Sequence, residues 1–169
     1  MGIHLNNSAY PDERLRRSIF RILETVTLCS LATAGLDAVA HINTAYYCYT
    51  DGIEIYFVSD PGTKHCHNIA IQPRIAVAIF DTNQPWGDAL RGLQMFGECH
   101  LASAQESIAA FRAHASRFLA YGDYIQALSP FERDSSPHKF YVFLPASVKI
   151  LDESAFGEET FVTAEIVRD

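Results

Sequence analysis

The sequence predicts a mainly β protein, a six-stranded antiparallel barrel with an N-terminal helix before it and a helical insertion before the last strand. Three observations lead to this prediction. Six runs rich in β-branched and aromatic residues are bounded by turn residues. Two of these runs flank Asp51-Gly52, the strongest short-range signal for a hairpin. Most connections are too short to hold the crossover helices of a parallel sheet, which favours antiparallel pairing.

The bulk composition fits one domain with one core. The chain has 169 residues, of which 49% are hydrophobic and 20% charged, and a chain of this size buries roughly two-thirds of its unfolded surface. The formal net charge of −7 disfavours a nucleic-acid partner, because phosphate binding needs clustered Lys and Arg. We therefore expect a single domain over 1–169, with its core at about 26–151 and a C-terminal tail at 152–169.

Cysteine spacing and hydropathy bear on the compartment. The four cysteines are widely spread without a CxxC pair, which predicts free thiols in a reducing, cytoplasmic setting: Cys29, Cys48, Cys66 and Cys99. No run reaches the about 18 apolar residues that a membrane span needs. Asn6, Asn7 and Asp12 interrupt any apolar run at the N-terminus, so neither a signal peptide nor a membrane partner is expected.

The first predicted element is a helix that Pro11 opens and that extends to about Thr25, because apolar residues recur there at helical spacing. Residues 1–9 before it are expected to form a loose polar lead. Three strands follow, separated by turns at Ala34-Gly35 and Asp51-Gly52, and their predicted bounds are Val26–Thr33, Ala38–Thr50 and Ile53–Ser59.

The second half begins with a short helix predicted over 64–72. Two strands, a two-part helical segment and a last strand follow it: Arg74–Asp81, Ala89–Leu101, Ala104–Leu128 and Lys139–Leu151. The two helical parts are expected to meet near Gly122, and Pro145 to mark a bulge or an edge. The tail from Asp152 is acidic, and Thr160–Val167 could pair on a sheet edge.

The most informative candidate site is the segment from Asp60 to His65, where a strand ends, a turn follows and a helix begins. Helix N-termini attract anions, and a phosphate suits the Thr63 hydroxyl, the Lys64 charge and the close backbone approach at Gly62. Ordinary helix capping by Asp60 or Thr63 accounts for the same residues, so both interpretations stay open. The Walker A pattern is absent, which disfavours a nucleoside triphosphate.

Polar residues on two strands are further candidates for ligand contacts. His41 and Asn43 share one face of the second predicted strand, although a polar outer face is the alternative interpretation. Gln94 lies between Gly92 and Gly97, two glycines that can mark bulges or a close approach of a ligand. Its amide can both donate to and accept from a flat heterocycle.

Metal and nucleophile chemistry are not expected. His65, Cys66 and His67 are adjacent, and adjacent positions on a helix point in different directions, so these side chains cannot converge on one ion. Ser30 and Ser59 lack the G-x-S-x-G setting of a nucleophilic serine. Difficult chemistry without side-chain catalysts usually depends on a cofactor.

Together these segments resemble the pyridoxamine 5′-phosphate oxidase-like family of FMN-binding split barrels. The resemblance covers about Leu28 to Leu151 and rests on the order and spacing of seven segments. These segments are Cys29–Thr33, His41–Tyr47, the Asp51-Gly52 hairpin, Ile55–His65, Asn68-Ile69, Pro73–Val77 and Arg91–Cys99. It implies a Greek-key split barrel and a homodimer that holds the flavin between its subunits and acts on a small molecule.

The resemblance also implies the cofactor-binding residues. The flavin phosphate would lie on the position of Asn43 and at the start of the helix, the isoalloxazine would pass along two strands, and the strand of Gln94 would face the same region. The expected FMN contacts are therefore Asn43, Thr44, Ala45, Val58, Ser59, Thr63, Lys64, His65 and Gln94.

Departures from the family pattern are informative about the substrate. Cys48 stands where pyridoxamine phosphate oxidases place a phosphate-binding lysine, and their C-terminal Arg-Leu-His-x-Arg pattern is missing. Asn43 and His65 stand where basic residues are usual. Oxidation of vitamin B6 is therefore not expected.

The resulting hypothesis is an FMN-dependent oxidoreductase that transfers hydride through flavin N5 to an unknown small substrate. One alternative is a non-catalytic flavin-binding or sensing protein, and a deazaflavin could replace FMN. Another alternative is a haem-binding protein, for which the candidate ligands are His41, His65, His67, His100, His114 and His138.

Overall fold

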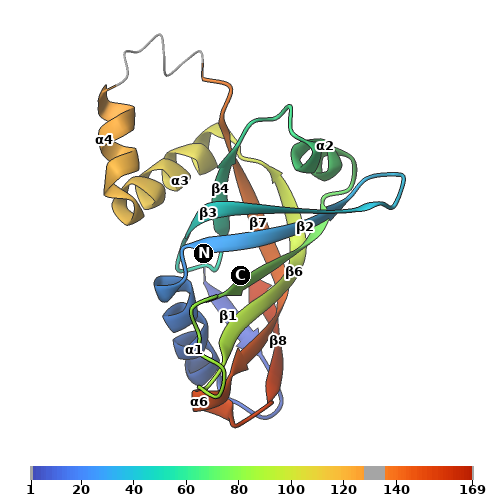
Figure 1. Cartoon of the computed structure of the whole chain (residues 1–169), viewed down its shortest axis with the longest axis vertical. Helices are drawn as coiled ribbons and strands as arrows, with labels where there is room; N and C mark the ends of the chain where they lie inside the picture. Colours follow the sequence, from blue (N-terminus) through green and yellow to red (C-terminus); the bar gives the residue numbers. More distant parts are fainter. Residues whose placement is uncertain (1, 128–135, 169) are drawn as a thin grey trace.

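The computed structural model of the protein describes residues 2–127 and 136–168 (Figure 1). Its centre is a closed barrel of six antiparallel strands, in which each strand pairs with the next in the order β3-β2-β5-β6-β7-β4 and β4 pairs again with β3. The strands are β2 (Leu28–Ala34), β3 (Ala40–Tyr49), β4 (Ile55–Ser59), β5 (Arg74–Phe80), β6 (Arg91–Leu101) and β7 (Lys139–Asp152). The predicted six-stranded antiparallel barrel is confirmed.

Five helices lie around the barrel within the described residues: α1 (Asp12–Thr25), α2 (Lys64–Ile71), α3 (Ala104–Arg117), α4 (Leu119–Ala127) and α6 (Glu153–Phe156). In Figure 1, α1 lies along the lower part of the barrel, whereas α2 and the insertion α3–α4 lie at its upper end. The apolar stripe predicted for the first helix is the face that α1 buries, with Leu15, Ile19, Ile22 and Leu23 in the core.

Two further strands extend the barrel sheet. β8 (Phe161–Arg168) pairs with the C-terminal half of β7, and β1 (Ile3–Asn6) pairs with β8. The prediction of edge pairing in the tail is confirmed, but the prediction of a loose lead over 1–9 is wrong. A four-residue strand carries too little alternation to be visible in sequence, and β1 forms because β8 offers it an edge and Leu5 a buried position.

The Asp51-Gly52 hairpin is confirmed, although its geometry differs from the expected one. The turn closes with the Ile53 N–H donating to the Thr50 carbonyl at 2.9 Å. The left-handed residue is Ile53, with φ of 55°, rather than either residue of the Asp-Gly pair. Burial of the Ile53 side chain in the core compensates for this strained backbone.

Two other predicted irregularities have different outcomes. A bulge next to Pro145 is confirmed: Gly97 is opposite Pro145 and Phe96 opposite Ser147, so β7 has one extra residue there. The break in the helical insertion, however, is at Phe118 instead of Gly122. Gly122 lies inside α4, where the small residue lets α4 approach Ala115 of α3 closely.

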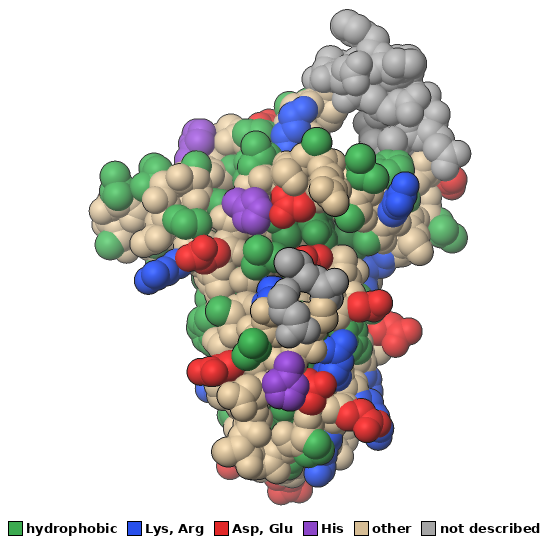
Figure 2. Space-filling view, turned by 180° about the vertical axis from the view of Figure 1, so that it is seen from behind, with side chains coloured by type: hydrophobic (Ala, Val, Ile, Leu, Met, Phe, Trp, Pro, Cys, Tyr) green, Lys and Arg blue, Asp and Glu red, His purple; other side chains and the backbone are tan. Residues whose placement is uncertain are grey.

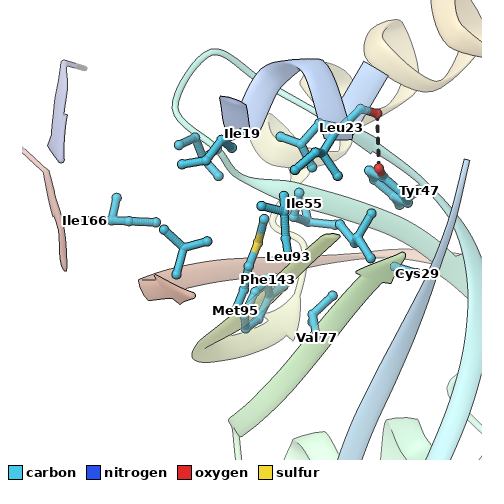
Figure 3. Close-up of a cluster of buried hydrophobic side chains, with 14 of the residues drawn as sticks. Ile19, Leu23, Cys29, Tyr47, Ile55, Val77, Leu93, Met95, Phe143 and Ile166 are labelled. Carbon is cyan, nitrogen blue, oxygen red and sulfur yellow. Dashed lines mark hydrogen bonds between the residues drawn. The ribbon is translucent and has the colours of Figure 1, made fainter. Parts of the chain in front are cut away.

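The main core lies between α1 and the inner face of the barrel (Figure 3). Side chains from α1, from the barrel strands and from β8 meet there, among them Ile19, Leu23, Tyr47, Ile55, Met95, Phe143 and Ile166. The Tyr47 hydroxyl donates to the Leu23 carbonyl at 3.1 Å, which fixes the end of α1 to β3. No helix in the described part of the chain has both the length and the hydropathy to cross a membrane.

Candidate functional site

A cavity of about 470 Å³ opens between β3, β4, the N-terminal end of α2 and the insertion α3–α4. Its walls contain seven of the nine residues that the resemblance implies for FMN, namely Asn43, Thr44, Ala45, Val58, Ser59, Thr63 and His65. The volume is within the range of about 300–1,000 Å³ typical of small-molecule sites. Residues far apart in the sequence therefore meet at one site.

The split between β3 and β4 creates the cavity. The two strands pair only where Tyr47–Tyr49 lie opposite Ile55–Phe57, so Asn43–Tyr46 have no partner strand on the side that faces β4. The backbone groups along this edge of β3 are therefore available to a ligand. Asn43 and Ala45 point to one side of the strand, and Thr44 and Tyr46 to the other.

The turn between β4 and α2 forms one end of the cavity. Thr63 is the N-cap residue of α2, but its side chain accepts no hydrogen bond from the helix. Its hydroxyl donates to the Asp60 carbonyl at 2.8 Å, and an Asp60 carboxylate oxygen accepts the Gly62 N–H at 2.8 Å. Side-chain capping by Thr63 thus does not occupy the first-turn N–H groups of α2, which remain attractive to an anion.

His65 is a buried hydrogen-bonding residue at the same end. Its Nε2 lies 2.7 Å from the Ser59 hydroxyl and 3.3 Å from the Thr63 hydroxyl. The ring stacks on His41 with 6.2 Å between centroids. Burial first, and then the neighbouring His41, lower the pKa of His65 below its usual value. At neutral pH His65 therefore acts as a neutral partner for hydroxyls, not as a cation.

Two of the predicted cofactor residues lie away from the cavity in this chain. Lys64 Nζ is 3.8 Å from the Asp37 carboxylate, because neighbouring residues on a helix point in different directions and Thr63 and His65 take the cavity side. Gln94 lies on the outer face of the barrel and lines a separate depression of about 290 Å³.

The pairing register nevertheless relates Gln94 to the cavity. One row of cross-strand neighbours runs over the outer face from β3 through β2 and β5 to β6. Its members are Thr44, Ser30, Ala78 and Gln94. Thr44 is at the end of this row that borders the cavity, and Gln94 is at the other end.

The residues expected to contact FMN include none from the helical insertion, although His114 and His138 are among the candidate haem ligands. His114 and Tyr121, together with His138 before β7, line the cavity. The signal was present in α3, because Ala110 and His114 are four residues apart and form its buried face. A histidine on the buried face of a predicted helix is a signal that points to such a position.

His114 has an unusual environment for a titratable side chain. It is 5% exposed, and its ring centroid lies 4.3 Å from that of Tyr121 and 4.8 Å from that of Phe118. Its Nδ1 has no hydrogen-bond partner among the described residues. Burial, and then the charge of Arg117, lower the pKa of His114 to about 4, so the ring is neutral at physiological pH.

None of the four cysteine thiols is exposed in this structure. All four are buried and unpaired. Cys48 lies beneath α3 and donates to the Ala110 carbonyl at 3.7 Å, and burial raises its pKa to about 12. The position where the resemblance leads one to look for a phosphate-binding lysine thus holds a covered, neutral thiol. No cluster suited to a metal ion occurs within residues 2–127 and 136–168.

Comparison with known proteins supports the same fold. The family model described as pyridoxamine 5′-phosphate oxidase matches residues 15–152. A heme binding protein from Mycobacterium smegmatis has a TM-score of 0.70 at 19% identity; the alignment covers 94% of this chain and 60% of that one. The present chain therefore spans less than two thirds of the length of that protein. No curated protein matches at a significant level.

Two further solved structures cover most of both chains. HutZ, a heme storage protein from Vibrio cholerae, has a TM-score of 0.62 at 12% identity, covering 78% of this chain and 90% of that one. A FAD-binding protein from Mesorhizobium loti has a TM-score of 0.59 at 15% identity, covering 99% and 100%. At these identities the likeness shows the fold alone. With its closed split barrel and a family match over residues 15–152, the chain belongs to the pyridoxamine 5′-phosphate oxidase family.

Proposed function

We propose that the chain binds FMN in the cavity between β3, α2 and α3–α4 and works as an FMN-dependent oxidoreductase on a small substrate. The observation that carries the proposal is the convergence of Asn43–Ala45, Val58–Ser59, Thr63 and His65 on one cavity at the N-terminal end of α2. When bound, the flavin supplies hydride transfer through N5, and the protein supplies anchoring, orientation and shielding from water.

The α2 end of the cavity suits the phosphate. The first-turn N–H groups of α2 and the hydroxyls of Ser59 and Thr63 are hydrogen-bonding groups at this end. Asp60 is also on the wall, and its bond to the Gly62 N–H holds one carboxylate oxygen within the turn. A dianion there is therefore received mainly by dipoles and hydroxyls.

Lys64 would add the missing positive charge. Its contact with Asp37 is between two side chains that are each about half exposed, 52% and 54%. Exposed ion pairs of this kind contribute roughly 0–1 kcal/mol, so Lys64 can exchange Asp37 for a phosphate at low cost. In this proposal the lysine moves to the cavity when the ligand binds.

The open edge of β3 suits the ring system. Asn43, Thr44 and Ala45 offer backbone donors and acceptors, because no strand pairs with them on the cavity side. Tyr46, His114 and Tyr121 contribute aromatic surface against which a flat heterocycle can pack.

A second copy of the chain would complete the site. The outer face of β3, β2, β5 and β6 places Ile42, Ala32, Ala76 and Phe96 in one row, with Ile42 69% and Phe96 47% exposed. Apolar patches of this kind usually mark interfaces. In a symmetric dimer through this face, Gln94 of one copy would lie opposite Thr44 of the other copy, beside the cavity of that second copy.

Titration with FMN tests the proposal. The wild-type protein should retain or acquire the flavin absorbance bands, and the double variant Thr63→Ala, Lys64→Ala should weaken binding by roughly tenfold or more, because two phosphate contacts are lost. Lys149→Ala is the matched control, since Lys149 lies on β7 over the ring of Phe161 and off the cavity wall. A colourless protein that gains no flavin absorbance, or a double variant with unchanged affinity, contradicts the proposal.

Turnover separates an oxidoreductase from a passive flavin carrier. NAD(P)H consumption in air should exceed the rate of free FMN at the same concentration when the protein is present. A rate equal to that of free flavin would leave binding without catalysis, which is the flavin-carrier alternative.

Haem is the second candidate ligand, and one observation favours it: three imidazoles, of His65, His114 and His138, line the cavity. Two of the structurally similar proteins are described as heme proteins. His41, His67 and His100 do not line the cavity, and His100 is engaged with Glu106 at 3.1 Å. Haem titration should give a Soret band that one His→Ala change on the wall abolishes; without that band this candidate fails.

A further inference from the structure

The insertion α3–α4 is fixed to the rest of the molecule through Arg117, in the last turn of α3. Its Nη2 donates to the Leu23 carbonyl at 2.7 Å and to the Val26 carbonyl at 2.6 Å. The guanidinium also lies 4.9 Å from the ring centroid of Tyr47 and 5.0 Å from that of Tyr49. One side chain thus contacts the end of α1 and two rings of β3.

These contacts meet an electrostatic need of α1. The C-terminal end of a helix has unpaired carbonyl groups and a partial negative charge. The last turn of α1 contains no basic residue of its own. Arg117 supplies both the donors and the charge from a distant part of the sequence, so the end of α3 is tied to a helix whose apolar face is in the main core.

His114 lies in the same last turn of α3, three residues before Arg117. Positions three apart lie on the same face of a helix. On this face His114 lines the cavity, and Arg117 donates to the carbonyls at the end of α1. The position of this turn therefore determines where the imidazole stands on the cavity wall.

We propose that His114 is a ligand-binding residue of the cavity and that Arg117 is the positioning residue that holds it there; this rests on the proposed binding of FMN. The Nδ1 of His114 has no hydrogen-bond partner in the described part of the chain although the residue is almost fully buried. Buried polar atoms are normally satisfied, and this nitrogen is covered in the structure, so it can gain a partner when the His114 ring turns toward the cavity that the residue lines. A flat heterocycle with donors and acceptors along its edge, as in isoalloxazine, can supply that partner.

Four variants of the full chain test this assignment by FMN titration, with flavin fluorescence as the signal. His114→Phe keeps a ring of similar shape but removes the nitrogens, and Arg117→Met removes the tie to α1. Each should raise the Kd for FMN by roughly tenfold, about the worth of one hydrogen bond, and should alter the visible spectrum of the bound flavin. Arg117→Lys keeps the charge and should restore part of the affinity.

Arg112→Met is the matched control, because Arg112 is an exposed arginine on the same helix. It should leave the Kd within about twofold of the wild-type value. Hydrogen exchange gives a readout without FMN: Arg117→Met should speed exchange over Ala104–Arg117 and leave β2 and β6 unchanged, whereas His114→Phe should leave α3 protected.

The outcomes separate the two proposals. If the wild-type protein does not bind FMN, both the proposed function and the role of His114 fall. If it binds FMN and His114→Phe and Arg117→Met bind it equally well, the function stands and this inference is overturned. If Arg117→Met weakens FMN binding without loosening α3, the positioning role of Arg117 is wrong.

Discussion

His114 and His65 show how burial changes what a histidine can do. An exposed imidazole has a pKa near 6.5 and is a pH-sensitive cation. In this cavity burial lowers the pKa of both rings, and for His114 the charge of Arg117 adds to the effect. Both side chains are therefore neutral hydrogen-bonding groups at physiological pH, which suits a site for a planar ligand better than a site that relies on cationic histidines.

The lowered pKa of His114 predicts a pH-dependent stability. Between its folded pKa of about 4 and the unfolded value of 6.5, the unfolded chain binds more protons, so the free energy of unfolding falls as the pH falls through this window. From about pH 7 to about pH 5 the loss from His114 should be about 2 kcal/mol. His65 acts in the same direction.

Urea unfolding at the two pH values measures this loss in the wild-type protein and in His114→Phe. The variant should lose less stability on acidification, because its share of the proton uptake is gone. Exposed His67→Gln is the control and should behave like the wild type. An identical acid sensitivity in His114→Phe would show that the ring is not held neutral by burial.

At the scale of elements, irregular pairing in the strands gives the barrel its shape. β7 pairs with β4 through its first five residues and with β8 through Ser147–Leu151, so one long strand serves both the barrel and its extension. The change of partner falls at the bulge opposite Gly97. Close approach of backbone to backbone at this point requires a residue without a side chain.

Gly97→Ala should therefore be strongly destabilising. A Cβ on Gly97 would lie 2.1 Å from the Leu144 carbonyl oxygen and 2.7 Å from Pro145 Cα, both of which are backbone atoms. We expect a loss of at least about 2–3 kcal/mol in the free energy of unfolding, measured by urea denaturation.

Gly52→Ala is the matched control for the hairpin. A Cβ there meets its nearest atom, the Thr50 hydroxyl, at 3.5 Å, and the left-handed position of the turn belongs to Ile53. The change should cost less than about 1 kcal/mol. A large loss at Gly52, or a small one at Gly97, would contradict the backbone geometry described for these two strands.

For the whole molecule, the outer face of the barrel is the surface through which the proposed dimer would complete the site. The β2–β3 hairpin extends sideways from the barrel in Figure 1, and in the reverse view of Figure 2 hydrophobic side chains lie along the projecting arm at the left. Leu36 and Val39 near the tip of this hairpin are exposed, as are Ile42, Tyr46 and Phe96 on the strands. The arm and the outer face thus both expose large apolar side chains, which often mark an interface.

Charge on this surface should break the proposed homodimer. Ile42→Glu and Phe96→Glu place carboxylates in the same cross-strand row, and each should shift the protein toward the monomer in light scattering coupled to size exclusion. FMN affinity should fall with the loss of the dimer by roughly tenfold or more. Val167→Glu is the control, because Val167 is comparably exposed on β8, away from this face.

A wild-type protein that is monomeric at micromolar concentration and binds FMN fully would contradict the dimeric arrangement of the site. Dimers that survive both substitutions would instead show that copies meet through another face.

The sequence by itself determined the local elements and part of the site. Hydrophobic period, turn residues and spacing predicted α1, the six strands and the helix that starts after Thr63, because these depend on residues near one another in the chain. The same local logic, joined to a family resemblance, named seven residues that do line one cavity. Asn43–Ala45 are adjacent on one strand, and Val58–His65 span one strand end, turn and helix start. Each group therefore stays together in any fold that keeps these elements.

Only the tertiary structure decided which distant residues join them. β1 exists because β8 offers an edge, and Ile53 rather than Gly52 adopts the left-handed backbone because the core fixes its side chain. His114 lines the cavity while Arg117, one turn further along α3, contacts carbonyls at the end of α1. Lys64 points to Asp37 because of its direction on the helix. These are contacts between surfaces that exist only after the chain has folded, and no local pattern encodes them.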